Sequence, residues 1–120
     1  MSGGGTPVTW PPAEVADNQL PTLVGLAVDV YHINIGTGDA AIYYLVQHPP
    51  LSVKSTNPFA QPYIHRACLI DGGKSGGAEQ IKKFLKYVPL NYQFSTSQGG
   101  RTGLLFPPFD SIVITHWDNG

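Results

Sequence analysis

Hydrophobic and polar residues alternate most regularly over residues 23–35, a segment rich in Val, Ile, Leu and Tyr. Val28 and Val30 are separated by Asp29 and followed by Tyr31. This period of two residues is typical of a β-strand with one face more apolar than the other. We therefore expect the first strand here.

A turn and a second strand are expected next. Gly36, Gly38 and Asp39 fit a structural turn, because glycine reaches positive φ at little cost and aspartate caps local backbone donors. Residues 40–46 read AAIYYLV, a nearly continuous apolar run that we expect to be buried on both faces. Two strands with a short connection predict a hairpin.

Residues 47–62 contain four prolines together with Ser, Thr and Asn, and they are expected to form a loop. Residues 63–70 fit a third strand, whose last four residues, ACLI, are expected to be fully buried. Asp71, Gly72 and Gly73 then end the strand, the two glycines acting as turn residues.

One clear helix is predicted between Ser75, which can cap its start, and Pro89, which ends it. Its apolar positions recur at helical spacing, at Ala78, Ile81, Leu85 and Val88. Glu79 lies in the first turn and the lysines toward the end, as the helix dipole favours. The lysines are therefore interpreted as a solvated helix face: Lys82, Lys83 and Lys86.

Residues 90–107 have no periodicity, and such long loops are usually functional or disordered. Residues 109–114 predict a last, buried strand, followed directly by polar residues. The order strand, strand, strand, helix, strand predicts an α/β fold with a mixed sheet.

Composition divides the chain into two parts. Residues 1–22 hold three consecutive glycines and several prolines, so they are expected to be a flexible or loosely packed lead-in. Residues 23–120 are apolar enough for one small core of modest stability.

Charge and cysteine content exclude several classes of protein. Seven basic and eight acidic residues give a net charge of −1, without the basic stripe of a nucleic-acid-binding protein. The single cysteine, Cys68, cannot form an internal disulfide and is expected to be a small buried hydrophobe. The sequence has neither a secretory signal nor an apolar run near the roughly 20 residues of a membrane helix, so a soluble, cytoplasmic protein is expected.

Polar side chains follow two of the predicted strands. His116 and Asp118 come directly after the last strand, where reaction chemistry is often placed in α/β sheets, and both are ligands that zinc accepts. The alternative is a polar loop in which the histidine bonds to the backbone. Asp71 follows the apolar third strand, where a buried and unpaired carboxylate would be costly. It therefore reaches solvent, accepts backbone hydrogen bonds in the glycine turn, or supports a metal site.

Two other patterns are weaker. Gly73, Lys74 and Ser75 suggest a phosphate-binding loop, but the first glycine of that motif is replaced by Cys68. Gly36 and Gly38 lack the third glycine of a dinucleotide-binding fingerprint. The remaining histidines within strands are expected to be packing or surface residues: His32 and His65.

Three segments in order resemble the metallo-β-lactamase superfamily, closest to the hydrolase domains of ComEC-type competence proteins. They are HINIGTGDAAIYYL at residues 32–45, ACLIDGG at 67–73 and FDSIVITHWDNG at 109–120. The resemblance implies the amino-terminal half of an αββα fold and a hydrolase that uses one or two zinc ions. It implies His116 and Asp118 as metal ligands, Asp71 as support for the metal site, and Asp39 as a structural turn residue.

Gly120 departs from the motif T-H-x-[HD]-x-D-H, which has aspartate at this position. The motif's last histidine and the second half of the domain are not among these residues. We therefore expect an incomplete metal site, truncated within its motif, with weak metal affinity and negligible turnover. The expected partner is the missing carboxyl-terminal half, and the substrate, a small molecule or phosphoester, is left open. The alternatives are a non-catalytic relative acting as a scaffold or binding module, and an unrelated small α/β binding domain.

Overall fold

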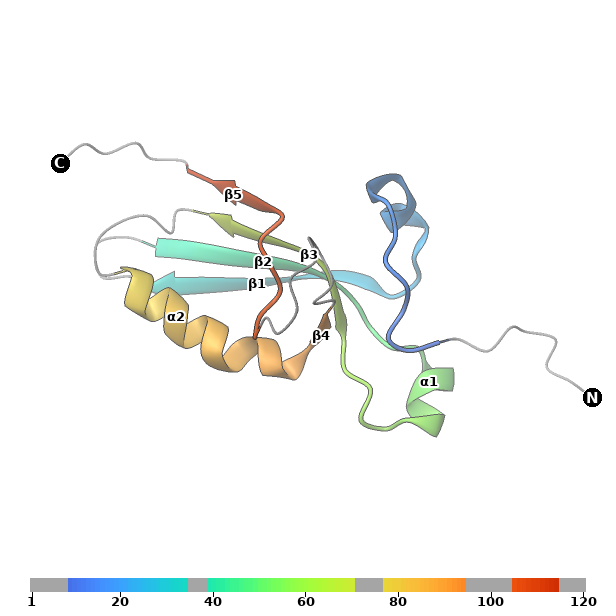
Figure 1. Ribbon diagram of the computed structural model, residues 1–120. Coiled ribbons are helices and arrows are strands. Elements are labelled where there is room, and N and C mark those ends of the chain that lie inside the picture. Colours follow the sequence, from blue (N-terminus) through green and yellow to red (C-terminus); the bar gives the residue numbers. More distant parts are fainter. Residues whose placement is uncertain (1–8, 35–38, 71–76, 95–104, 115–120) are drawn as a thin grey trace, which may run out of the picture.

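The computed structural model of the chain describes residues 9–34, 39–70, 77–94 and 105–114. It has a five-stranded mixed sheet with α2 across one face, which confirms the mixed α/β class (Figure 1). The elements in chain order are η1 (Asp17–Thr22), β1 (Leu26–Asn34), β2 (Asp39–Gln47), α1 (Leu51–Thr56), β3 (Tyr63–Ile70), α2 (Gly77–Tyr87), η2 (Val88–Asn91), β4 (Gln93–Phe94) and β5 (Ser111–Val113).

The first two strands form the expected antiparallel hairpin. Their register runs from Leu26 opposite Gln47 to Asn34 opposite Asp39. Gly25 precedes β1 with a φ of 82°, and its carbonyl oxygen accepts a hydrogen bond of 2.9 Å from the backbone N–H of His48. A non-glycine residue is strained at such a φ, so glycine is needed where the far end of the hairpin closes.

β3 joins antiparallel and parallel pairings in one sheet. It is antiparallel to β2, with a register shift between Leu45 and Val46. Two short strands run parallel to it, β4 beside its start (Tyr63 opposite Gln93) and β5 beside its end (Ile70 opposite Val113). The carboxyl ends of β3 and β5 are therefore neighbours.

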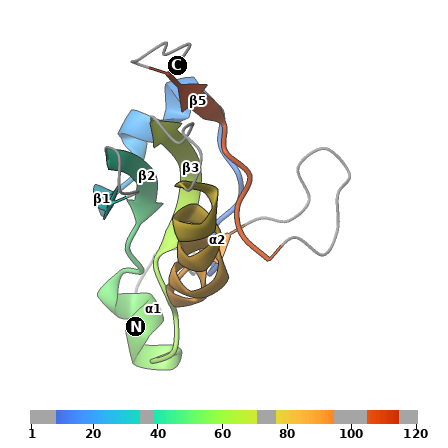
Figure 2. The ribbon, with the colours of Figure 1, turned by 90° about the vertical axis from the view of Figure 1, so that its left-hand side faces the viewer.

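The core lies between the sheet and α2. Ile42, Tyr44 and Val46 alternate along β2 and are completely buried on this face, together with Ile64, Ala67 and Tyr92. Phe84 of α2 packs against them. Figures 1 and 2 show α2 on one side of the sheet and η1 on the other. The helix confirms the predicted periodicity, and its lysines are exposed as expected.

The second face of the sheet is more open than the sequence predicted. Tyr43 and Leu45 are only half-buried, so the expectation that β2 is buried on both faces is wrong. The last residues of β3 were expected to be fully buried, but of these only Ala67 is, while Cys68, Leu69 and Ile70 are half-buried. No described element covers this face beyond the segment of residues 9–22, and the continuous apolar runs were misread for that reason.

β5 was also expected to be buried, and it is exposed. Ile112 is 62% and Val113 42% exposed. β5 is three residues long and pairs with β3 alone among the described strands, so its outer edge has no neighbour there. The apolar sequence predicted a buried strand where the structure has a short edge strand.

Two segments that were expected to be loops contain short elements. α1 lies within residues 47–62, and its six residues begin directly after Pro50, in keeping with the preference for proline near helix starts. Pro89 falls inside η2, which extends the chain beyond α2, and β4 follows at Gln93–Phe94. Elements of two to six residues are too short to show a period in the sequence.

The segment expected to be a loose lead-in is anchored over the part that is described. The Trp10 indole N–H donates to the carbonyl oxygen of Gln61 at 2.9 Å and to Gln93 Oε1 at 2.8 Å. Arg66 holds Asp17 by an ion pair of 2.7 Å. None of the residues of η1 is buried, so the contacts are few but specific. The domain boundary at residue 23 stays a prediction.

Helices long and apolar enough to cross a membrane are absent from the described residues.

Candidate functional site

The candidate metal-site residues lie in segments outside the described residues. These are Asp71, His116 and Asp118, and the same holds for the turn residues Gly36, Gly38, Gly72 and Gly73. Asp39 is placed as the first residue of β2, opposite Asn34. The roles assigned to all of them stay predictions.

The strands that lead to these residues are described, and they are adjacent. Ile70, the residue before Asp71, is paired with Val113, three residues before His116. Because β3 and β5 are parallel, both strands end at the same edge of the sheet. A topology that separated these two strands would have removed the basis for a shared site.

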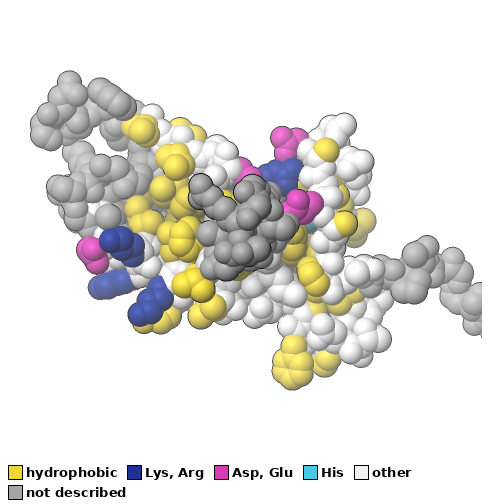
Figure 3. Space-filling model, viewed as in Figure 1, with side chains coloured by type: hydrophobic (Ala, Val, Ile, Leu, Met, Phe, Trp, Pro, Cys, Tyr) yellow, Lys and Arg dark blue, Asp and Glu magenta, His cyan; other side chains and the backbone are white. Residues whose placement is uncertain are grey.

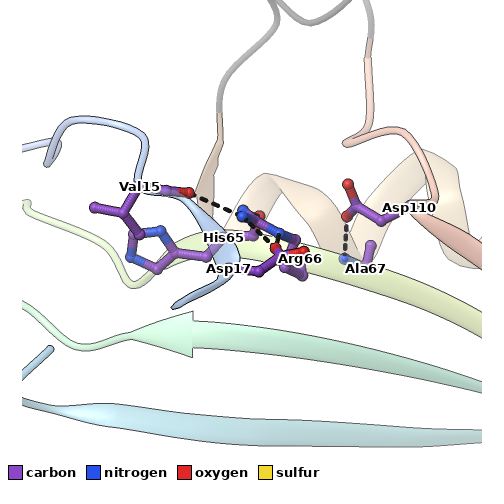
Figure 4. Close-up of polar contacts among 6 residues, drawn as sticks. All are labelled: Val15, Asp17, His65, Arg66, Ala67 and Asp110. Carbon is purple, nitrogen blue, oxygen red and sulfur yellow. Dashed lines mark hydrogen bonds and ion pairs between the residues drawn. The ribbon is translucent and has the colours of Figure 1, made fainter. Parts of the chain in front are cut away.

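A polar cluster lies further back along β3, around Arg66 (Figure 4). Its Nε and Nη2 atoms donate to Asp17 Oδ1 at 2.9 and 2.7 Å, and Nη2 also donates to the carbonyl oxygen of Val15 at 2.8 Å. Nη1 donates to the carbonyl oxygen of His65 at 2.8 Å. All three guanidinium nitrogens are therefore engaged within the chain, and they fasten residues 15–17 to the sheet.

Asp110 is the second part of this cluster. Its Oδ2 atom accepts the backbone N–H of Ala67 at 2.8 Å, and its own backbone N–H donates to the carbonyl oxygen of Ala67, also at 2.8 Å. This double contact fixes the chain just before β5 against β3. In Figure 4 the second carboxylate oxygen of Asp110 points away from β3.

A groove of about 790 Å³ runs over the open face of the sheet beside this cluster. Its apolar lining comes from β1, β2 and β3, and its charged lining from residues 14–17, Arg66 and Asp110. In Figure 3, the charged side chains beside η1 form a group separate from the basic side chains on α2.

His65 is a packing residue, as its position inside a strand predicted. Its side chain is 5% exposed, its Nε2 atom shares a hydrogen bond of 2.9 Å with Gln47 Oε1, and its ring meets the Tyr63 ring edge-on at 4.9 Å. Burial, and then the positive charge of Arg66, lower the pKa of His65 below its ordinary value. The neutral imidazole is therefore favoured in the folded chain.

A second polar cluster lies under α2 and was missed in the sequence. The Tyr92 hydroxyl donates to Asp29 Oδ2 at 2.5 Å and shares a hydrogen bond with the hydroxyl of Tyr31. Burial and the hydrogen bond to Asp29 raise the pKa of Tyr92. The signal in the sequence was Asp29, a carboxylate between two valines of an expected strand. The register of the sheet places it opposite Tyr44 of the core.

The described residues contain no group of three or more His, Cys, Asp or Glu side chains placed to hold a metal ion. The acidic side chains of the Arg66 cluster are used in ion pairing and backbone anchoring, and neutral His65 bonds to Gln47. These contacts hold segments together and do not pair a nucleophile with a base.

Comparison with protein-family models, with curated proteins and with solved structures finds no match for this chain.

Proposed function

We propose that this chain belongs to a metal-dependent hydrolase of the metallo-β-lactamase type. His116 and Asp118 are the proposed metal ligands, and Asp71 supports the site. The proposal rests on the three sequence segments described above. One structural observation supports it most directly: β3 and β5, which precede Asp71 and His116, are parallel neighbours with Ile70 opposite Val113.

The donor set fits zinc. Imidazole and carboxylate are ligands that this ion accepts, and catalytic zinc sites use three protein ligands with one open position. His116 and Asp118 supply two, so we propose that further ligands come from a second half of the domain. When bound, the ion would lower the pKa of a coordinated water toward ~7 and neutralise charge developing on an ester, amide or phosphoester.

In this proposal the chain's own residues position the ion. His116 would hold the ion through a ring-nitrogen lone pair, which requires a neutral imidazole, and Asp118 would contribute a carboxylate oxygen. Asp71 follows the neighbouring strand in the sequence and would orient the site by hydrogen bonding, as carboxylates near zinc ligands do.

Paramagnetic broadening in NMR spectra tests the location of the proposed site. Manganese(II) added to the isotope-labelled chain should broaden the amide signals of Ile70 and Ile114, the described residues that come just before Asp71 and His116 in the sequence. His116→Ala and Asp118→Ala should abolish that broadening. His32→Gln is the matched control, because it removes an exposed histidine of β1 that is not a proposed ligand, and it should have no effect.

Two results would contradict the proposal. Broadening centred on other residues, or unchanged broadening in His116→Ala, would remove the metal site from the ends of β3 and β5. Because two ligands bind zinc weakly, we also expect no measurable zinc-dependent cleavage of a phosphodiester by the 120 residues alone. Zinc-dependent turnover by these residues would show that the metal site needs no ligands beyond them.

The second candidate is a non-catalytic relative that serves as a binding or scaffold module. Gly120 favours it, because this residue stands where the motif has an aspartate and has no side chain to bind a metal. An absence of ion-specific broadening at both Ile70 and Ile114 is the result expected from this candidate.

A further inference from the structure

The groove on the open face of the sheet has a continuous apolar floor. Its floor residues are Val28, Tyr43, Leu45 and Cys68. The register places Val28 opposite Leu45 and Tyr43 opposite Cys68, so these side chains share one face of three adjacent strands. The floor is accessible, since Val28 is 56% exposed. Its volume of about 790 Å³ matches that of pockets for small organic ligands, about 300–1,000 Å³.

The charged rim of the groove is predominantly acidic. Three carboxylates, those of Glu14, Asp17 and Asp110, line it together with the guanidinium of Arg66. Arg66 already donates from all three of its nitrogens to Asp17, Val15 and His65. An anionic ligand would therefore have to break contacts that hold residues 15–17 in place.

The other carboxylates leave capacity for a cation. Asp110 uses one oxygen on the Ala67 N–H, and its second oxygen points away from the strand (Figure 4). Glu14 is exposed at the rim. Carboxylates at the edge of an apolar surface favour a positively charged ligand. The apolar surface itself contacts the apolar part of a ligand whatever the ligand's charge.

We propose that this groove binds a small amphipathic cation. Its apolar body lies on Val28, Tyr43, Leu45 and Cys68, and its ammonium or guanidinium group is held by Glu14 and Asp110. None of these residues is among the proposed metal ligands or the support residue. The inference therefore goes beyond the proposed hydrolase function and can fail or succeed independently of it.

Cys68 gives a direct readout, because it is the only cysteine of the chain and lies on the groove floor. The rate of its alkylation by iodoacetamide, which is uncharged, is measured with octyltrimethylammonium below its micelle concentration. Amide shifts of Leu45 and Cys68 in NMR titrations give the affinity independently of thiol reactivity. We expect alkylation to slow several-fold, with much weaker effects from tetramethylammonium, octyl glucoside and octyl sulfate.

The double variant Glu14→Gln, Asp110→Asn removes the proposed cation contacts. Asparagine keeps an oxygen for the Ala67 N–H, so the anchor before β5 is preserved, and thermal melting followed by circular dichroism checks the fold. The concentration for half-maximal protection should rise about tenfold, as for loss of a favourable charge contact. Glu79→Gln removes one negative charge from an exposed position on α2 and should leave protection unchanged.

Three outcomes would overturn the proposal. The first is equal protection by octyl glucoside or octyl sulfate, which would show an apolar surface without charge selection. The second is no protection, or protection unaffected by the double variant. The third is protection that rises with protein concentration in the absence of any ligand, together with a dimer in light scattering, which would identify a second copy of the chain as the occupant.

Discussion

At the scale of single residues, His65 links stability to pH. Its ring is buried between Tyr63 and Gln47, and its pKa in the folded chain is lowered by burial and by Arg66. The unfolded chain therefore binds a proton at a higher pH than the folded chain does. The free energy of unfolding must fall as pH drops below the ordinary histidine pKa of 6.5 and stop falling below the pKa of folded His65.

The expected result is a loss of stability, dependent on His65, as the pH falls below 6.5. The loss is at most about 1.4 kcal/mol for each pH unit, the limit for one titrating group. Urea unfolding at pH 7.5, 6.5, 5.5 and 5.0 measures it. His65→Gln should flatten this part of the profile, whereas His32→Gln, at an exposed site, should leave the wild-type slope. An equal slope in all three proteins would contradict the assignment.

Residue-level expectations from the sequence were right where local context decided them. His65 was expected to be a packing or surface histidine because it lies inside a strand, and the structure places it among the packing residues. The contact of Arg66 with Asp17 joins residues 49 positions apart, and no local pattern encodes it. Asp71, His116 and Asp118 were identified from their places after apolar strands and from the motif, and their chemistry stays a prediction.

At the scale of elements, the hairpin depends on a backbone conformation at Gly25. Its φ of 82° lies in the left-handed region, and an added Cβ would be 3.1 Å from the carbonyl oxygen of His48. That carbonyl belongs to the residue whose N–H bonds to Gly25. The entry to β1 and the exit from β2 are thus held together at one glycine.

Gly25→Ala should destabilise the chain by about 1–2 kcal/mol, the cost of a left-handed conformation for a residue with a Cβ. Chemical denaturation measures the change. Gly25→Asn is the informative comparison, because asparagine tolerates this region better than alanine, and it should lose less stability. If both variants lose the same amount, crowding against His48 rather than φ is the cause. If alanine costs nothing, the hairpin is not closed at this position.

The sequence predicted the elements that are long enough to show a period. β1, β2, β3 and α2 span eight to eleven residues each, and each was expected near its observed place. α1 and β4 span six and two residues, so pairing partners and packing decide them. The burial of β5 was misjudged because apolar composition does not reveal whether a strand has neighbours on both edges.

At the scale of the whole molecule, one face of the sheet is covered by α2 and the other face is largely open among the described residues. α2 seals the core on one side of the sheet, and beyond residues 9–22 the other side is exposed among the described residues (Figures 1 and 2). The closed side is tied across the chain by Tyr92, which follows η2 and bonds to Asp29 in β1, 63 positions away. This bond joins the carboxyl-terminal side of α2 to the hairpin.

Loss of the hydroxyl should change the stability of the chain differently at two buried tyrosines of this core. Tyr92→Phe leaves the half-buried Asp29 carboxylate without its donor, so stability should fall by about 1–3 kcal/mol. The hydroxyl of Tyr44 is buried and has no hydrogen-bond partner among the described residues. Tyr44→Phe removes that unsatisfied group and should be neutral or stabilising.

Equilibrium unfolding of both variants tests this contrast, with Tyr87→Phe as the control at a tyrosine that is 61% exposed. The control should match the wild type, since its hydroxyl is open to water. A large loss in Tyr44→Phe would show that its hydroxyl has a partner, such as an internal water bridging it to the Asp29 and Tyr92 cluster. A double variant lacking both hydroxyls separates the two cases, because independent sites give additive changes and a shared network does not.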